Sequence, residues 1–216
     1  MIYVPTTPTQ AELALTPVAL ASTAPSALVA PVHTSLRLRS AQLNVLEDHR
    51  ATVTGTLLQN RHAAEPGLLV ALQALSSHGW KTLTRARTGA HGRFRLSYAP
   101  HRLASELTRL RFTGNAIALG SRTRLGRLNV FRLAGASWYG GGGTMACGGE
   151  LTSNTLGVAN KTLPCGTLVT LRYGDHSVRV PVVDRGPYVA GREFDLTEAT
   201  KRALGFGDTG DVWSTD

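Results

Sequence analysis

The sequence has few cysteines, few acidic residues in its front half and no long uninterrupted apolar run. The longest apolar stretches of the 216-residue chain are broken by proline, serine and threonine, so no segment reads as a transmembrane helix. The two cysteines lack the CxxC or Cys/His spacing of a zinc site. The glycine run at 140–143 is not followed by Gly-Lys-Ser/Thr, which excludes a phosphate-binding loop. The length instead predicts two folded domains of about a hundred residues each.

The charge is divided unevenly along the chain. Residues 32–134 carry 16 basic and 4 acidic residues, a net charge of +12, whereas residues 135–216 carry 7 basic and 9 acidic residues, a net charge of −2. A basic domain attracts polyanions such as nucleic acid or an anionic cell wall. No nucleic-acid motif accompanies the charge, so we expect no nucleic-acid ligand. An anionic wall polymer and a merely solvated arginine surface remain as the two interpretations.

Residues 1–35 form a low-complexity segment rich in alanine, proline, threonine and serine. The stretch 13–21 resembles the apolar region of a signal peptide and ends in an Ala-x-Ala site, but no basic region precedes it. A start site placed too far downstream explains this, and we therefore expect an exported, wall-associated protein whose signal peptide is truncated in this sequence. The alternative is a disordered tail.

Residues 36–133 contain short alternating runs separated by turn signals, which predict an arginine-rich β-sandwich. Alternation places aromatic and aliphatic side chains in the core and arginine outside. The expected core includes Trp80, Leu83, Phe94, Leu96 and Phe112. The pattern is similar to that of Ig-like sandwich modules that precede cell-wall domains in secreted bacterial proteins.

Residues 134–216 begin where the composition shifts toward glycine, and we place a domain boundary there. The residues 173–176 predict a hairpin turn between two strands. One short helix is expected from Thr197 to Leu204, with Asp195 or Thr197 as its cap and Gly205 after its last turn.

Five motifs in the last part of the chain resemble those of the rare lipoprotein A (RlpA)-like family, which includes septal ring lytic transglycosylases and is related to expansins. The motifs are Ala-Ser-Trp-Tyr-Gly at 136–140, Ala-Cys-Gly-Gly-Glu-Leu-Thr at 146–152, Gly-Val-Ala-Asn-Lys-Thr-Leu-Pro-Cys-Gly-Thr at 157–167, Val-Pro-Val-Val-Asp-Arg-Gly-Pro-Tyr at 180–188 and Gly-Arg-Glu-Phe-Asp-Leu-Thr at 191–197. The resemblance covers residues 136–212 and implies a six-stranded double-psi β-barrel. The whole protein is thus expected to be mainly all-β, a sandwich followed by a barrel with one short helix.

The resemblance also implies peptidoglycan as the substrate and a catalytic set of Asp184, Glu150 and Asp195. The position where the family has a histidine is Asn160, and an amide cannot transfer a proton near neutral pH. Two functions therefore stay open: lytic transglycosylase-like cleavage of glycan strands, or expansin-like binding of wall glycan without cleavage. Neither requires a cofactor, a metal or a second protomer, so we expect a monomer without either.

Each carboxylate also has an ordinary structural interpretation. Asp184 follows an apolar strand and suits a general acid, but aspartate also builds turns such as the one that follows it. Glu150 lies in a glycine-flanked loop, where it stabilises positive charge or is simply solvated. Asp195 is either a site carboxylate or the helix cap.

The remaining candidates bind substrate or hold the site together. Trp138 and Tyr139 alternate in a strand, so one of them is expected to face a groove and stack on a sugar ring, although Trp is more often a core residue. Arg185 and Tyr188 are expected to contact sugar hydroxyls or muropeptide carboxylates, unless Arg185 pairs with Asp184 or Glu193. The substrate-binding set is completed by Asn160.

The two cysteines, Cys147 and Cys165, flank the loop with Glu150. A disulfide is the simplest use of an isolated pair in an oxidising compartment, and it would stabilise the fold by about 3 kcal/mol. Two buried free thiols are the alternative.

Overall fold

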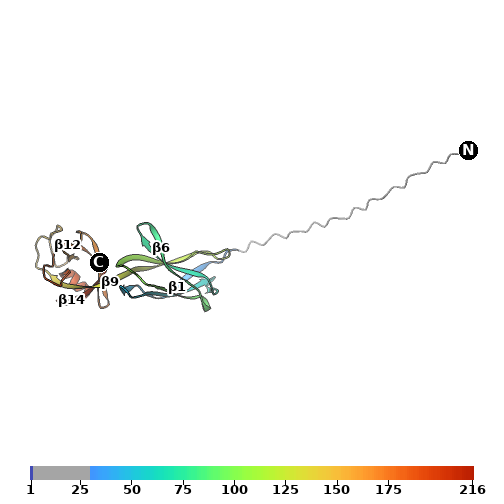
Figure 1. Ribbon diagram of the computed structural model, residues 1–216, viewed down its shortest axis with the longest axis horizontal. Coiled ribbons are helices and arrows are strands. Elements are labelled where there is room, and N and C mark those ends of the chain that lie inside the picture. Colours follow the sequence, from blue (N-terminus) through green and yellow to red (C-terminus); the bar gives the residue numbers. More distant parts are fainter. Residues whose placement is uncertain (2–29) are drawn as a thin grey trace. The chain divides into compact units, whose positions relative to one another are not determined.

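The computed structural model describes Met1 and residues 30–216 (Figure 1). The tail or signal-peptide remnant expected at residues 1–35 therefore lies largely outside the described residues. Residues 31–216 form one compact unit, in which strands predominate. In the part of the chain that the structure describes, no helix is long and apolar enough to cross a membrane.

The front part of this unit consists of two sheets. The smaller sheet contains β1 (Thr34–Gln42), β3 (Ala51–Gln59), β4 (His62–Ala63) and β7 (Arg93–Tyr98). The larger sheet contains β2 (Asn44–Leu46), β5 (Leu69–Ser76), β6 (Gly79–Arg87), β8 (Ala104–Phe112) and the first part of β9 (Ser121–Tyr139). A 3-10 turn, η1 (Ala90–Gly92), precedes β7.

One hydrophobic cluster draws on both sheets, as expected for a sandwich. Its members include Val53, Leu57, Leu72, Phe94, Leu96, Leu110, Phe112 and Leu128. The all-β class predicted from the alternating pattern is confirmed. The Ig-like topology of residues 36–133 stays a prediction.

The position of Trp80 differs from the prediction that it lies in the core. The pairing of β5 with β6 shifts between Leu72 and Gln73, so that Leu83 has no partner in the register and forms a bulge. The extra residue reverses the alternation, because side chains change face at every position of a strand. Leu83 therefore packs against the core, whereas Trp80 is only half-buried and lies beneath the guanidinium of Arg109.

The back part of the unit is a closed barrel of six strands. They are the second part of β9 together with β10 (Val158–Ala159), β11 (Leu168–Tyr173), β12 (His176–Asp184), β13 (Phe194–Thr197) and β14 (Thr209–Ser214). The order is β13-β10-β12-β11-β14-β9, and parallel pairing of β13 with β9 closes the ring. The β11–β12 hairpin turns between Tyr173 and His176, as predicted. A second hydrophobic cluster fills the barrel, and it includes Ala134, Ala136, Val158, Val169, Leu171, Val180, Val182, Phe194, Leu196 and Val212.

Among residues 30–216 the structure has one α-helix, α1 (Glu198–Leu204), which agrees closely with the predicted range. Thr197 is the N-cap, and its hydroxyl accepts a hydrogen bond from the backbone N–H of Thr200. Gly205 follows the last turn with φ of 63°, the left-handed conformation that glycine adopts without a Cβ penalty. The cap is therefore Thr197, and Asp195 is free for another role.

β9 is 19 residues long and belongs to both parts of the unit (Figure 1). Its residues 121–130 pair with β8, and its residues 132–139 pair with β14 and β13. Val130 is buried in the first hydrophobic cluster and Ala134 in the second. The chain therefore passes from one cluster to the other within a strand.

Gly135 gives a test of this junction, because a Cβ there would collide with the carbonyl oxygen of Gly191. We expect Gly135→Ala to lower the free energy of unfolding by roughly 1–3 kcal/mol, since backbone must move to make room. Gly207→Ala is the matched control, because nothing lies within 4 Å of a Cβ at that position. Urea denaturation of both variants measures the difference, and equal stabilities would contradict the close approach.

Candidate functional site

The proposed site is a row of residues across four neighbouring strands of the barrel. Ala159 of β10 lies opposite Asp184 of β12 on one side and opposite Asp195 of β13 on the other. Asp195 in turn lies opposite Ser137 of β9. Because adjacent strands are about 4.8 Å apart, the backbones of Asp184 and Asp195 are separated by about 10 Å. Only a small alanine stands between these two carboxylates.

Asp184 ends β12 and anchors the loop that precedes the disulfide. Its Oδ1 accepts hydrogen bonds from the backbone N–H of Ala146 and of Arg185, both at 2.8 Å. Among residues 30–216, no hydrogen bond of standard geometry and no ion pair occupies Oδ2, and the hydroxyl of Tyr139 lies close to this carboxylate. The turn-building role and an open carboxylate oxygen are therefore present in the same side chain.

Glu150 lies in the loop that Asp184 holds. The loop is fixed to the end of β12 by Ala146 and by Cys147, whose N–H donates to the carbonyl of Val183 at 3.2 Å. Glu150 is exposed, and its Oε1 accepts a hydrogen bond from the hydroxyl of Thr144 at 2.6 Å. The loop is therefore docked beside Asp184, while the convergence of the two carboxylates on one ligand stays a prediction.

Asp195 is half-buried and accepts a short hydrogen bond from the hydroxyl of Ser137. Ser137 is buried, so its hydroxyl has little access to water and holds the carboxylate in one orientation. Sequence reasoning did not single out Ser137. The signal that was available is its place two residues before Tyr139, since residues i and i+2 of a strand share a face.

Tyr139 and Trp138 point to opposite sides of β9. Burial, followed by the negative charge of Asp184, a hydrogen-bonding contact with Asp184 and the charge of Asp195, raises the pKa of Tyr139 above its ordinary value of 10.0. Its hydroxyl is buried beside Asp184, and no hydrogen bond of standard geometry pairs it among the described residues. Tyr139 is therefore the member of the pair that lies beside both carboxylates, and it keeps its proton well above neutral pH.

Trp138 is engaged by the segment around α1. Its Nε1 donates to Asp208 at 3.0 Å, and the ammonium of Lys201 lies 3.8 Å from the ring centroid. The 2.9 Å hydrogen bond from Lys201, followed by the hydrogen bond from Trp138 and the charge of Lys201, lowers the pKa of Asp208. The ring is 38% exposed, with one face covered by Lys201. A role in sugar stacking stays a prediction for this residue.

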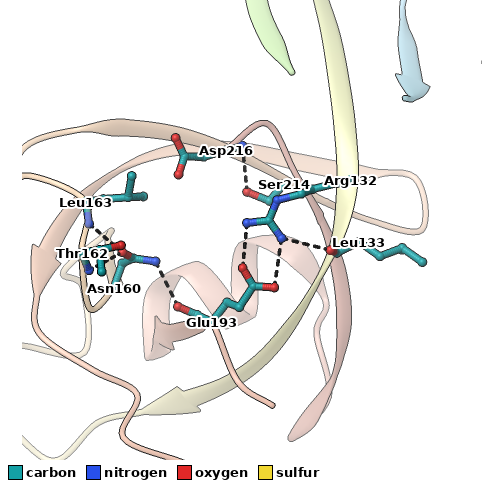
Figure 2. A network of polar contacts seen from close by, with 8 residues as sticks. All are labelled: Arg132, Leu133, Asn160, Thr162, Leu163, Glu193, Ser214 and Asp216. Atoms are coloured by element: carbon teal, nitrogen blue, oxygen red, sulfur yellow. Dashed lines mark hydrogen bonds and ion pairs between the residues drawn. The ribbon is translucent and has the colours of Figure 1, made fainter. Parts of the chain in front are cut away.

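Asn160, at the position of the family histidine, is buried and fully engaged (Figure 2). Its side-chain oxygen accepts hydrogen bonds from the backbone N–H of Thr162 at 3.0 Å and of Leu163 at 2.9 Å. Its amide nitrogen donates to the carbonyl of Glu193 at 3.1 Å. The carboxylate of Glu193 in turn forms two hydrogen bonds with Arg132 of β9. Asn160 therefore shapes its own loop and ties it to the neighbouring segment, and contact with a substrate stays a prediction.

Arg185 holds the same loop from the other side. Its guanidinium donates to the carbonyls of Asn160 at 3.1 Å and Leu163 at 3.0 Å, and to the sulfur of Cys165 at 3.1 Å. Within the described residues it forms no ion pair, so the alternative pairings with Asp184 and Glu193 are absent. The Cys147–Cys165 disulfide is present, with the two Cα atoms 5.6 Å apart. It links this loop to the one that carries Glu150.

The remaining candidates differ in exposure and position. Tyr188 is 82% exposed, and its ring lies beside Gly186 in the segment after Asp184. His176 begins β12 while Asp184 ends it, about 26 Å away along the strand, so the imidazole cannot replace the missing histidine. Among the residues that the structure describes, no three His, Cys, Asp or Glu side chains gather as metal ligands would.

Tyr139→Phe is the test of this arrangement. At neutral pH we expect the free energy of unfolding to change by less than about 1 kcal/mol or to rise, because the buried hydroxyl that is removed forms no hydrogen bond of standard geometry. As pH rises above 10.0, the unfolded chain loses the tyrosine proton before the folded chain does, so the wild type is destabilised. The Tyr139→Phe variant has no tyrosine proton at this position, so its free energy of unfolding does not fall for this reason.

Urea denaturation of both proteins at pH 7 and at about pH 11 measures the effect. The other tyrosines are common to both proteins and cancel in the comparison. An identical fall in stability for both would contradict the raised pKa.

Comparison with known proteins identifies the barrel. Residues 133–212 match the family model described as "Lytic transglycolase". The "Probable endolytic peptidoglycan transglycosylase RlpA" of Synechocystis sp. is 39% identical over 109 residues, which cover 44% of this chain and 34% of that protein. The protein of the same name from Aquifex aeolicus is 43% identical over 75 residues, which cover 32% of this chain and 33% of that protein.

The chain thus spans about a third of the length of the curated relatives it matches. Among solved structures, the Streptomyces papain inhibitor is 24% identical with a TM-score of 0.32, over 38% of this chain and 91% of that one. The family match, the relatives and the closed ring of six strands agree with the five motifs. Residues 136–212 are an RlpA-like double-psi β-barrel.

Proposed function

We propose that the protein cleaves peptidoglycan glycan strands outside the cytoplasm by a lytic transglycosylase reaction. The observation that carries this proposal is the row of Asp184, Asp195 and Tyr139 in a segment that matches the lytic transglycosylase family model. The relatives' names support peptidoglycan as the substrate class. The disulfide supports an oxidising, extracytoplasmic compartment.

The chemistry assigns one carboxyl group to both proton transfers. In the first step the carboxyl group of Asp184 donates a proton to the glycosidic oxygen as the bond to the anomeric carbon breaks. The 6-hydroxyl of the same sugar then attacks the anomeric carbon, and its proton returns to Asp184. The products are a free 4-hydroxyl and a 1,6-anhydro sugar, and no water is consumed. The backbone bonds to Oδ1 orient the carboxyl group and leave Oδ2 to carry the proton.

The developing positive charge on the sugar ring needs negative charge nearby. In our proposal Asp195, oriented by Ser137, and Glu150, in the loop docked beside Asp184, supply it. The protonated hydroxyl of Tyr139 donates a hydrogen bond to a sugar oxygen or to Asp184 as the substrate binds. The exposed ring of Tyr188 offers a surface on which a further sugar can stack.

A second candidate function is binding of wall glycan without cleavage. It is favoured by Asn160, because this amide cannot transfer a proton and its hydrogen bonds are taken by the surrounding backbone. The two functions differ in the products from purified sacculi. New 1,6-anhydro ends indicate lytic cleavage, new reducing ends indicate hydrolysis, and retention without new ends indicates a binding module.

Asp184→Asn tests the catalytic proposal. An asparagine oxygen still accepts the hydrogen bonds from Ala146 and Arg185, so the loop stays in place while the transferable proton is lost. We expect the release of anhydro-muropeptides to fall by at least about 100-fold, with binding to sacculi nearly unchanged. Chromatographic analysis of muropeptides measures the first, and pull-down with sacculi measures the second.

Asp175→Asn is the matched control, because it removes the same charge from a fully exposed side chain at the β11–β12 turn. We expect this variant to cleave at the wild-type rate. Cleavage that survives Asp184→Asn, or falls equally in both variants, would contradict the role of Asp184.

A further inference from the structure

A cluster of arginines on β8 and β9 stands apart from the barrel site. In the antiparallel pairing of these strands, Arg109 lies directly opposite Arg124 and Arg111 lies directly opposite Arg122. Residues two apart in a strand share a face, so all four side chains emerge from the same side of the sheet. Like charges directly opposite one another destabilise a sheet. We refer to Arg109, Arg111, Arg122 and Arg124 as the arginine cluster.

No acidic side chain compensates this charge. Residues 32–134 contain only four acidic residues, and Glu106, the one that lies on β8, pairs with Arg102. Within the part of the chain that the structure describes, no member of the arginine cluster forms an ion pair with a carboxylate. Burial, with the charges of Arg111 and Arg122, lowers the pKa of Arg109, which reflects the crowding. The cluster is therefore an uncompensated concentration of positive charge.

Two open cavities flank the cluster and share two of its members. One, of about 360 Å³, is lined by Arg109, Arg111, Phe112, Thr113, Gly120, Ser121 and Arg122. The other, of about 400 Å³, is lined by Trp80, Arg109, Arg122 and Arg124. Ser121 lies opposite the buried Phe112 in the register, so its side chain is on the core face and the guanidinium groups supply the donors of these cavities.

Arg109, at the centre, is held in place before any ligand arrives. Its Nε donates to the side-chain oxygen of Gln73 at 2.9 Å, and its guanidinium carbon lies 4.0 Å from the centroid of the Trp80 ring. Gln73 is fixed in turn by a 3.1 Å hydrogen bond to Thr82. A guanidinium that is already oriented loses little freedom on binding. The half-buried position of Trp80, which differs from the sequence prediction, thus allows its ring to contact Arg109.

We propose that the arginine cluster binds the phosphate groups of a polyol-phosphate polymer of the bacterial cell wall. Every polar side-chain group that lines the two cavities is a donor or a hydroxyl, so the ligand must be rich in acceptors. Phosphate oxygens point in several directions and accept from several guanidinium groups at once, whereas a carboxylate offers two oxygens in one plane. Two cavities that share Arg109 and Arg122 fit successive phosphates of one chain.

The phosphate chemistry is independent of the barrel, but the choice of a wall polymer rests on the proposed function. The test uses the full chain and a fluorescently labelled polyol-phosphate wall polymer, with binding followed by anisotropy at low and at physiological salt. Arg109→Gln combined with Arg122→Gln is expected to weaken binding at least about tenfold. Relief of like-charge repulsion offsets the loss of the Arg109 contacts with Gln73 and Trp80, and thermal unfolding checks that the variant remains folded.

The matched control is Arg37→Gln combined with Arg93→Gln, on the other sheet. These two arginines flank Thr56 in the pairings of β3, so they do not lie directly opposite each other. The control removes the same net charge and is expected to weaken binding less than about threefold. Equal weakening by both pairs would overturn the proposal in favour of diffuse attraction.

Polyglutamate and duplex DNA of equal charge complete the set of probes: tighter binding of polyglutamate would overturn the phosphate preference, and tighter binding of DNA would replace the wall polymer by nucleic acid. Sacculus cleavage should be unaffected in all these variants, which separates a failure here from a failure of the proposed function.

Discussion

The parallel pairing of β13 with β9 is the contact on which the barrel and its candidate site depend. It closes the ring of six strands and fixes Phe194 and Leu196 in the hydrophobic cluster. Because neighbours in a strand face opposite ways, the same register turns Asp195 toward Ser137 on the other face. The burial of the two apolar residues, which stabilises the fold, therefore also sets the position of a carboxylate. Asp184 joins the row through β10, whose two residues pair with both β12 and β13.

A frame of loop contacts surrounds this row. Asp184 holds the first loop through Ala146, Arg185 and Asn160 hold the second, and the disulfide joins the two loops. The hydrogen bonds of Asp184, Arg185 and Asn160 satisfy backbone groups that would otherwise lie unpaired at the end of the barrel. Side chains to which the motif resemblance assigns a role in catalysis or substrate binding therefore also stabilise the loops of this chain. These loop contacts hold the carboxylates in fixed positions, as a functional site requires.

Local signals in the sequence were sufficient to predict the helix and the turn, but they were not sufficient to predict the contacts between elements. The helix cap and the β11–β12 turn follow from Thr197, Gly205 and the residues 173–176, whose preferences are local. Trp80 was misplaced because a bulge depends on how two strands pair, which no single strand reveals. The environments of Tyr139, Trp138 and Asn160 likewise depend on residues 33 to 70 positions away that only the closed barrel brings together. The arginine cluster shows the same limit, since its charge is visible in the sequence but its direct opposition is a matter of register.

The passage of β9 through both hydrophobic clusters has a consequence for how such a protein can evolve. Most folded modules are joined by exposed linkers, which tolerate insertions and deletions. Here Val130 and Ala134 serve different clusters from one continuous strand, and the family match begins at residue 133, inside it. Gain or loss of a single residue between them would reverse the inward face of whatever follows, and Ala134 and Ala136 would leave the barrel core. Recombination that grafts this barrel onto another partner must therefore splice in steps of two residues, and length variation should be found in the loops rather than at the join.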